Sequence, residues 1–161
     1  MAAEGAAVRF SLDEWMLRLH GLAYDDEQYV RLLPDCRALM LDTAAHVLRT
    51  GIDVVLDWNH FSPEQRAASA AWANEQGATY VVHHVTTSPD AARARLVRRN
   101  RAGEPQSHVI APEELDHALT YCTSPTADEG HQVIRHENDE RSLEARRKAL
   151  RARVRRTSSS T

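Results

Sequence analysis

Ile52-Asp53-Val54-Val55-Leu56-Asp57 is the stretch that decides the fold class of this sequence. It is β-branched and almost continuously apolar, which is typical of a strand that is buried on both faces in a parallel sheet. A second stretch of this kind is Thr79-Tyr80-Val81-Val82-His83-His84-Val85, and weaker candidates lie at residues 7–11 and 132–135. Together these segments predict a mostly parallel sheet.

Longer segments with helical signals separate the expected strands. The expected helices span residues 26–49, 63–76, 89–100 and 112–121. Pro34 indicates a start or a bend in the first of these helices. Ser62-Pro63-Glu64-Gln65 and Ser88-Pro89 each place a capping serine before a proline at the first helical position. The alternation of strands and helices predicts an α/β fold in which helices cover a parallel sheet.

The length of 161 residues favours one domain. We expect the α/β domain to span residues 1–138. Residues 139–161 are expected to form an arginine-rich helix that ends in a disordered Ser/Thr tail. The net charge of −3 does not favour a general attraction of the whole chain to nucleic acid or to an anionic membrane.

Cysteine usage and hydropathy indicate the compartment. Cys36 and Cys122 lie far apart, without the spacing of a metal site or of a disulfide framework, which favours a reducing environment. No apolar run has the length of a membrane span, and the first residues lack the features of a signal peptide. We therefore expect a cytoplasmic protein without a membrane partner, and its oligomeric state stays open.

Polar residues follow several of the expected strands, where open parallel sheets bind their ligands. Asp13 follows the first strand, Asp57 and Asn59 end the second, and the helix after the third strand contains Arg95 and Arg99. A carboxylate can accept the proton of an attacking hydroxyl or hold Mg²⁺ through water, and arginines neutralise the charge of a moving phosphoryl group. This set of residues therefore indicates phosphoryl transfer.

Several segments, taken in order, resemble P-loop kinases, the AAA-type ATP-binding proteins of the polynucleotide-kinase and zeta-toxin type. The resemblance covers about residues 7–135. The segments are Ser11-Leu12-Asp13-Glu14-Trp15-Met16, residues 51–59 with Arg66 downstream, residues 95–100, and residues 112–134, which are similar to the carboxyl-terminal part of that group.

The resemblance implies a P-loop NTPase-like three-layer sandwich that transfers the γ-phosphate of ATP, with Mg²⁺, to a hydroxyl of a small molecule or of a nucleic-acid end. It implies that Asp13 is the base toward the hydroxyl. Asp57 takes the Walker B-like position and holds Mg²⁺ through water, and Asn59 lies beside it at the nucleotide. Arg95 and Arg99 match lid arginines that act in catalysis, and Arg99 also contacts the nucleotide.

The sequence departs from this family in one respect. The family's first strand, its G-x-x-x-x-G-K-[ST] loop and the following helix are expected before residue 7, and they are not in the sequence. The only lysine, Lys148, has no glycine nearby. We expect the sheet to lack its central strand, which leaves exposed edges or a hole. Either the reading frame starts at an internal methionine, which is favoured, or the chain is a decayed copy. In both cases we expect this exact chain to be inactive by itself.

Other interpretations stay open at this point. Asp13 can be the N-cap of a helix that begins at Glu14. Most of the arginines between Arg93 and Arg99 can form a solvated helix face, and Arg66 can lie on the surface. The main alternative function is a non-catalytic remnant or binding module of the same fold, and a more distant one is nucleic-acid binding. The acceptor substrate cannot be read from the sequence.

Overall fold

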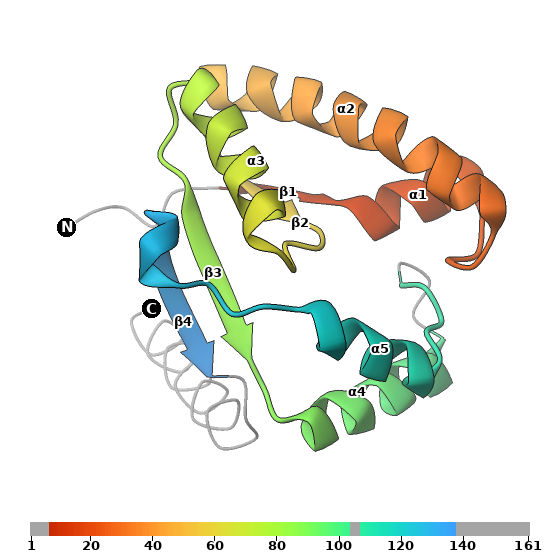
Figure 1. Ribbon diagram of the computed structural model, residues 1–161. Coiled ribbons are helices and arrows are strands. Elements are labelled where there is room, and N and C mark those ends of the chain that lie inside the picture. The colour runs from red at the N-terminus through yellow and green to blue at the C-terminus, as the bar shows by residue number, and fades with distance from the viewer. Residues whose placement is uncertain (1–6, 104–106, 138–161) are drawn as a thin grey trace, which may run out of the picture.

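The computed structural model describes residues 7–103 and 107–137 (Figure 1). The elements are β1 (Ala7–Ser11), α1 (Leu12–His20), α2 (Glu27–Arg49), β2 (Asp53–Asp57), α3 (Pro63–Glu75), β3 (Val81–Thr86), α4 (Pro89–Ala102), α5 (Pro112–Tyr121), a 3₁₀ turn η1 (Ala127–Glu129) and β4 (Gln132–Glu137). The helix and tail expected at residues 139–161 lie outside the described residues. No described helix is both long enough and apolar enough to cross a membrane.

The four strands form two separate parallel pairs. β1 pairs with β2, with Phe10 opposite Leu56, and β3 pairs with β4, with Val82 opposite Val133. Among the described residues β2 and β3 are not paired, so the expected mostly parallel sheet is present as two two-stranded halves. The α/β content with short parallel strands is confirmed, whereas the three-layer sandwich stays a prediction.

The main hydrophobic core lies between the β1–β2 pair and the helices α1 and α2, which contact each other (Figure 1). Phe10 from β1 and Leu56 from β2 are opposite each other in register, so both side chains are on the same face of the sheet. Met16 of α1 and Met40 of α2 are completely buried in this core. The core therefore fixes where α1 begins relative to the end of β2.

The serine caps expected at the starts of two helices are confirmed. The Ser62 hydroxyl accepts a hydrogen bond from the Gln65 amide at 3.3 Å, and the Gln65 side chain accepts one from the Ser62 amide at 3.1 Å. Ser88 caps α4 in a similar way through the amide of Ala91. Pro34 neither starts nor interrupts a helix, because α2 runs continuously from Asp26, its cap residue.

Arg66 holds α3 to the segment that leads into β4. Its side chain is 1% exposed and binds both carboxylate oxygens of Glu129, at 2.6 and 2.7 Å. The same guanidinium donates to the carbonyl oxygens of His60 and Thr123. Arg66 is thus a buried structural residue and not a surface residue, because Glu129 neutralises its charge and the other acceptors satisfy its N–H groups.

Candidate functional site

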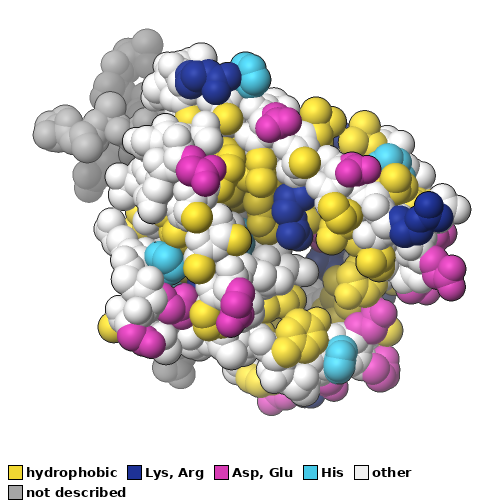
Figure 2. All heavy atoms as spheres, turned by 45° about the horizontal axis from the view of Figure 1, so that its top comes forward, with side chains coloured by type: hydrophobic (Ala, Val, Ile, Leu, Met, Phe, Trp, Pro, Cys, Tyr) yellow, Lys and Arg dark blue, Asp and Glu magenta, His cyan; other side chains and the backbone are white. Residues whose placement is uncertain are grey.

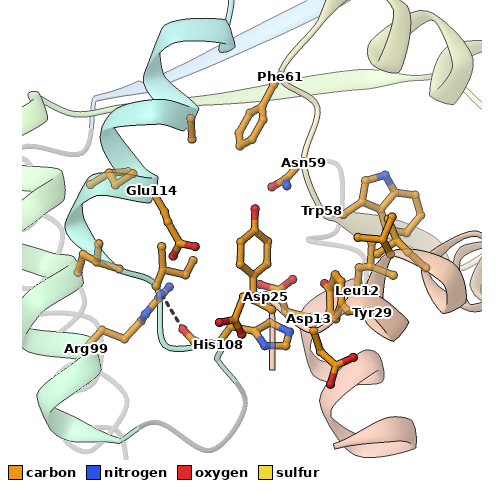
Figure 3. A pocket seen from close by; sticks show the side chains of 18 of the residues that line it. Leu12, Asp13, Asp25, Tyr29, Trp58, Asn59, Phe61, Arg99, His108 and Glu114 are labelled. Atoms are coloured by element: carbon orange, nitrogen blue, oxygen red, sulfur yellow. Dashed lines mark hydrogen bonds between the residues drawn. The ribbon is translucent and has the colours of Figure 1, made fainter. Parts of the chain in front are cut away.

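A cleft with a volume of about 1060 Å³ lies between α1 and α2 on one side and α4 and α5 on the other. Figure 2 shows a hollow on one face of the molecule, in which a basic side chain lies among hydrophobic ones, and Figure 3 shows the cleft from close by. The loop after β2 contributes Trp58, Asn59 and Phe61 to its lining. A concave site with apolar walls and a few charged groups is typical of small-molecule binding.

Asp13 lies in this cleft, in the first turn of α1. The helix begins at Leu12, and its N-cap residue is Ser11, whose side chain makes no capping hydrogen bond. The interpretation of Asp13 as the N-cap is therefore wrong, because Asp13 is already inside the helix. Its side chain is exposed and lines the cleft, where the partial positive charge of the helix N-terminus favours a carboxylate.

Tyr29 of α2 lies next to Asp13. Burial, which is the largest cause, the charge of Asp13 and a side-chain hydrogen bond to Asp13 together raise the pKa of the Tyr29 hydroxyl to about 12. The hydroxyl is therefore protonated at neutral pH and donates to the Asp13 carboxylate, which is acceptor-only when ionised. This hydrogen bond restricts the orientation of the carboxylate.

His108, in the segment before α5, packs against the tyrosines of the opposite wall. Its ring centre lies 5.2 Å from that of Tyr29 in an edge-on arrangement and 6.2 Å from that of Tyr24. Arg99 donates to the His108 carbonyl oxygen at 3.0 Å, the bond that Figure 3 marks with a dashed line. The His108 ring thus links the two walls of the cleft at one end.

The residues expected after β2 are divided between two environments. Asn59 lines the same cleft as Asp13, and Figure 3 shows it between Trp58 and Phe61. Asp57 is not among the residues that line the cleft. Its half-exposed carboxylate accepts a hydrogen bond from Arg9 at 2.8 Å. The structure thus places Asn59 in the same cleft as Asp13, and it places Asp57 in an ion pair with Arg9 outside the lining of the cleft.

The arginines of α4 are divided in the same way. Arg95 and Arg99, one helical turn apart, both line the cleft, as expected from their spacing, and Arg98 joins them. Arg93 does not line it, because its guanidinium binds Asp116 of α5 at 2.7 Å. The arginines of this helix therefore include a group that faces the cleft and one member that joins α4 to α5.

Arg37 is a residue of the cleft that was not identified as a site residue from the sequence. Arg37 of α2 lies with its guanidinium carbon 5.8 Å from the centre of the Trp58 ring. Tyr29, Leu33 and Arg37 all line the cleft, and their spacing of four residues places them on one face of a helix. This spacing was the signal in the sequence that could have identified Arg37.

The loop after β2 is held in place by His60. The His60 ring stacks on Trp58 at 5.9 Å between ring centres, and its Nε2 atom lies 2.8 Å from the Ser69 hydroxyl of α3. Burial, with a smaller contribution from the charge of Arg37, lowers the pKa of His60, so the ring is neutral at neutral pH. The position of the Trp58 ring is thus fixed by contacts outside the cleft.

The residues present fit part of a magnesium nucleotide. The guanidinium groups of Arg95 and Arg99 suit phosphate oxygens, and the Asp57 carboxylate suits Mg²⁺ bound through water. No cluster of three or more His, Cys, Asp or Glu residues within 7–103 and 107–137 is arranged to hold a metal ion directly. The sequence also contains no glycine-rich loop that would surround the β- and γ-phosphates with backbone amides. The fit is therefore limited to the arginines and to the carboxylate.

The model of the AAA domain family matches residues 1–125. The chain belongs to the AAA domain family. A comparison with curated proteins found no significant match. Membership of this family supports a nucleotide-binding domain of the P-loop NTPase-like, kinase or ATPase type, and such domains generally bind their nucleotide with Mg²⁺. The parallel strands, the connecting helices and the cleft beyond β1 and β2 agree with this assignment.

Proposed function

We propose that this AAA domain protein acts in phosphoryl transfer from ATP to the hydroxyl of an acceptor, a small molecule or a nucleic-acid end. The observation that supports this function best is that Asp13 and the pair Arg95 and Arg99 come from opposite walls of one cleft. A carboxylate and arginines that face each other across a cleft can act on an attacking hydroxyl and on a phosphoryl group at the same time.

In the proposed reaction Asp13 accepts the proton of the acceptor hydroxyl. Tyr29 orients the Asp13 carboxylate through its hydrogen bond. The other lone pairs of the carboxylate remain available for the hydroxyl of the acceptor. Arg95 and Arg99 neutralise the charge on the transferred phosphoryl group. Bound magnesium ATP would supply that phosphoryl group and would leave as ADP.

Asp57 is proposed to hold Mg²⁺ through water, with Asn59 beside it. The ion pair between Asp57 and Arg9 competes with this role, because both need the same carboxylate. Glu14 also binds Arg9, at 3.1 Å, and offers the guanidinium another partner when Asp57 turns toward a cation. Asp57→Asn is therefore expected to weaken the dependence of transfer on the Mg²⁺ concentration.

The phosphate-binding loop is the part of the proposed machinery that these 161 residues do not contain. We expect the 161-residue chain to bind ATP with Mg²⁺ weakly or not at all, because backbone amides and a lysine normally hold the β- and γ-phosphates. Isothermal titration calorimetry measures this directly. Micromolar binding by this chain would show that the nucleotide site lies elsewhere.

The coding DNA upstream of Met1 separates this proposal from its alternative. If the upstream codons, read in the same frame, encode a glycine-rich loop that ends in Gly-Lys-Ser or Gly-Lys-Thr, the kinase is supported. An in-frame stop codon directly upstream favours a non-catalytic remnant or binding module of the same fold. The absence of the loop from the present sequence is the observation that keeps this alternative open.

The role of Asp13 is tested in a version of the protein that includes such a loop. Asp13→Asn keeps the size of the side chain and removes its ability to take a proton. Transfer to the acceptor should fall about a hundredfold or more, while ATP affinity changes little. Asp35→Asn is the matched control, because Asp35 is exposed on α2 and does not line the cleft. Normal turnover in Asp13→Asn would show that Asp13 is not the base.

A further inference from the structure

Arg37 is a half-buried cation in the wall of the cleft, and no acidic residue that the structure describes forms an ion pair with it. Its Nε atom is buried and makes no hydrogen bond to the described residues. None of the ion pairs in the described part of the chain includes Arg37. A partly buried charge without a counter-ion is unfavourable, so a bound anion would stabilise this position.

Trp58 holds the Arg37 guanidinium in place. The indole ring is itself held by His60, which stacks on it and contacts the Ser69 hydroxyl. The guanidinium lies against the ring at 5.8 Å, where a cation is attracted to the aromatic face. An arginine that is already ordered loses little conformational freedom when its planar fork binds a carboxylate or a phosphate.

Part of the lining of the same cleft is apolar and aromatic. Phe61 and Tyr121 form one part of the wall, with ring centres 5.7 Å apart and planes at 65°. Leu12 and Leu33 form another part, on the side of α1 and α2. Aromatic and aliphatic walls of this kind favour a flat apolar group, because it buries a large area without needing hydrogen bonds.

We propose that the acceptor in the proposed phosphoryl transfer is a small molecule with an apolar ring and one anionic group, a phosphate or a carboxylate. Arg37 binds the anionic group, the aromatic wall encloses the ring, and the acceptor hydroxyl lies at Asp13. This inference rests on the proposed function and specifies its substrate class. Arg37 is a substrate-binding residue in this reaction and transfers no proton.

The charges on the lining favour a small acceptor over a nucleic-acid strand. A strand would bring several phosphates to the rim, and four carboxylates beyond Asp13 line the cleft. Like charges repel there, so a strand with several phosphates is disfavoured compared with a small molecule that brings one anionic group to Arg37. These four carboxylates belong to Asp25, Asp26, Glu27 and Glu114.

Three probes separate the contributions of the ring and of the charge. Calorimetry with the 161-residue chain, without ATP, would compare phenyl phosphate with benzyl alcohol, which lacks the anion, and with inorganic phosphate, which lacks the ring. Phenyl phosphate should bind most tightly. Arg37→Gln should weaken phenyl phosphate binding by about tenfold or more and leave benzyl alcohol binding nearly unchanged, because only the charged hydrogen bonds are lost.

Two further variants control this experiment. Arg31→Gln should bind all three probes like the unmodified chain, because Arg31 is an exposed arginine of the same helix that does not line the cleft. Arg37→Lys should lie between the unmodified chain and Arg37→Gln, since it keeps the charge and loses the planar fork. Equal binding of phenyl phosphate by Arg37→Gln and the unmodified chain would overturn the role of Arg37.

A direct measurement covers the case in which Arg37→Gln does not fold. Phenyl phosphate should shift the NMR signal of the Trp58 indole N–H in the unmodified chain, with the signal assigned by its loss in Trp58→Phe. No shift at saturating probe would overturn the site. If benzyl alcohol binds as tightly as phenyl phosphate, the proposal that the acceptor has an anionic group is wrong. A short single-stranded oligonucleotide that binds more tightly than phenyl phosphate would overturn the small-molecule class.

The outcomes for the site and for the proposed function can be told apart. One outcome is that phenyl phosphate binding depends on Arg37 but a loop-containing protein transfers no phosphoryl group from ATP. The anion site would then be supported, and the proposed phosphotransferase activity would be wrong. If transfer occurs only to neutral acceptors, the phosphotransferase activity is supported and the proposed anion site is wrong.

Discussion

The two strand pairs differ in how the structure stabilises them. The β1–β2 pair packs on α1 and α2 around side chains such as Met16 and Met40 that are completely buried. On the β3–β4 pair, Val85 is 58% exposed and Ile134 is 38% exposed. That part of the molecule is joined to the rest by polar contacts, above all the ion pair between Arg66 and Glu129.

This difference shows where the geometry of the cleft comes from. The wall with Asp13, Tyr29 and Arg37 belongs to the packed half, so the proposed base and the acceptor-binding arginine stand on a rigid support. The wall with Arg95 and Arg99 belongs to the half with fewer apolar contacts. Elements with few buried apolar contacts are the ones that open and close most easily, so we expect α4 and α5 to move relative to α1 and α2.

The largest expected effect tests the packed half. Met40→Ala removes a completely buried side chain from the core between α2 and β1, and it should lower the free energy of unfolding by about 4 kcal/mol. Chemical denaturation followed by circular dichroism measures this loss. Leu39→Ala is the matched control, since Leu39 is 53% exposed, and it should change the stability by less than about 1 kcal/mol. Similar losses for both variants would contradict the position of the core.

The next effect tests the polar connection. Arg66→Met removes one partner of a buried ion pair and leaves the Glu129 carboxylate and two carbonyl oxygens without donors. The free energy of unfolding should fall by about 3 kcal/mol. Arg49→Met, at an exposed arginine at the end of α2, should have little effect. An Arg66→Met protein as stable as the unmodified one would show that α3 and β4 are held together in another way.

Local signals in the sequence predicted most of the elements. The β-branched runs predicted β2 and β3, and the serine and proline pairs predicted the starts of α3 and α4, because strand burial and helix capping depend on neighbouring residues. The burial of Arg66 could not be predicted in this way, because its partner Glu129 lies 63 positions further along the chain. Long-range pairs of this kind have no local signature.

The site was predictable in part for the same reason. The spacing of Arg95 and Arg99 in α4 placed them on one face, and the structure shows that this face lines the cleft. The division between Asp57 and Asn59 depends on Arg9, which binds Asp57 across the β1–β2 pair. The sequence showed that both residues follow a strand, but not which of them would be bound by a neighbouring strand.

Acid provides a smaller perturbation of the same polar connection. The hydrogen bonds from Arg66 lower the pKa of Glu129 from its ordinary value of 4.5 to about 2. A carboxyl group with a lowered pKa in the folded state stabilises the protein above pH 4.5, and this contribution is lost as the pH falls from 4.5 toward 2. Melting temperatures across this range should fall, and they should fall less steeply in Glu129→Gln, which is less stable at neutral pH. Equal slopes for the two proteins would contradict this assignment.

The smallest expected effect concerns the ion pair between α4 and α5. Arg93 and Asp116 are separated by only 2.7 Å, but their side chains are 44% and 47% exposed, so water and salt screen their attraction. Arg93→Gln should therefore lower the free energy of unfolding by only about 0.5 kcal/mol, and less in high salt. The loss in the free energy of unfolding should be compared with that of Arg66→Met, because both variants remove an arginine from an ion pair of similar length. A loss in Arg93→Gln as large as that in Arg66→Met would show that solvent does not screen this ion pair, and that α4 and α5 are held together more firmly than the exposure of the pair indicates.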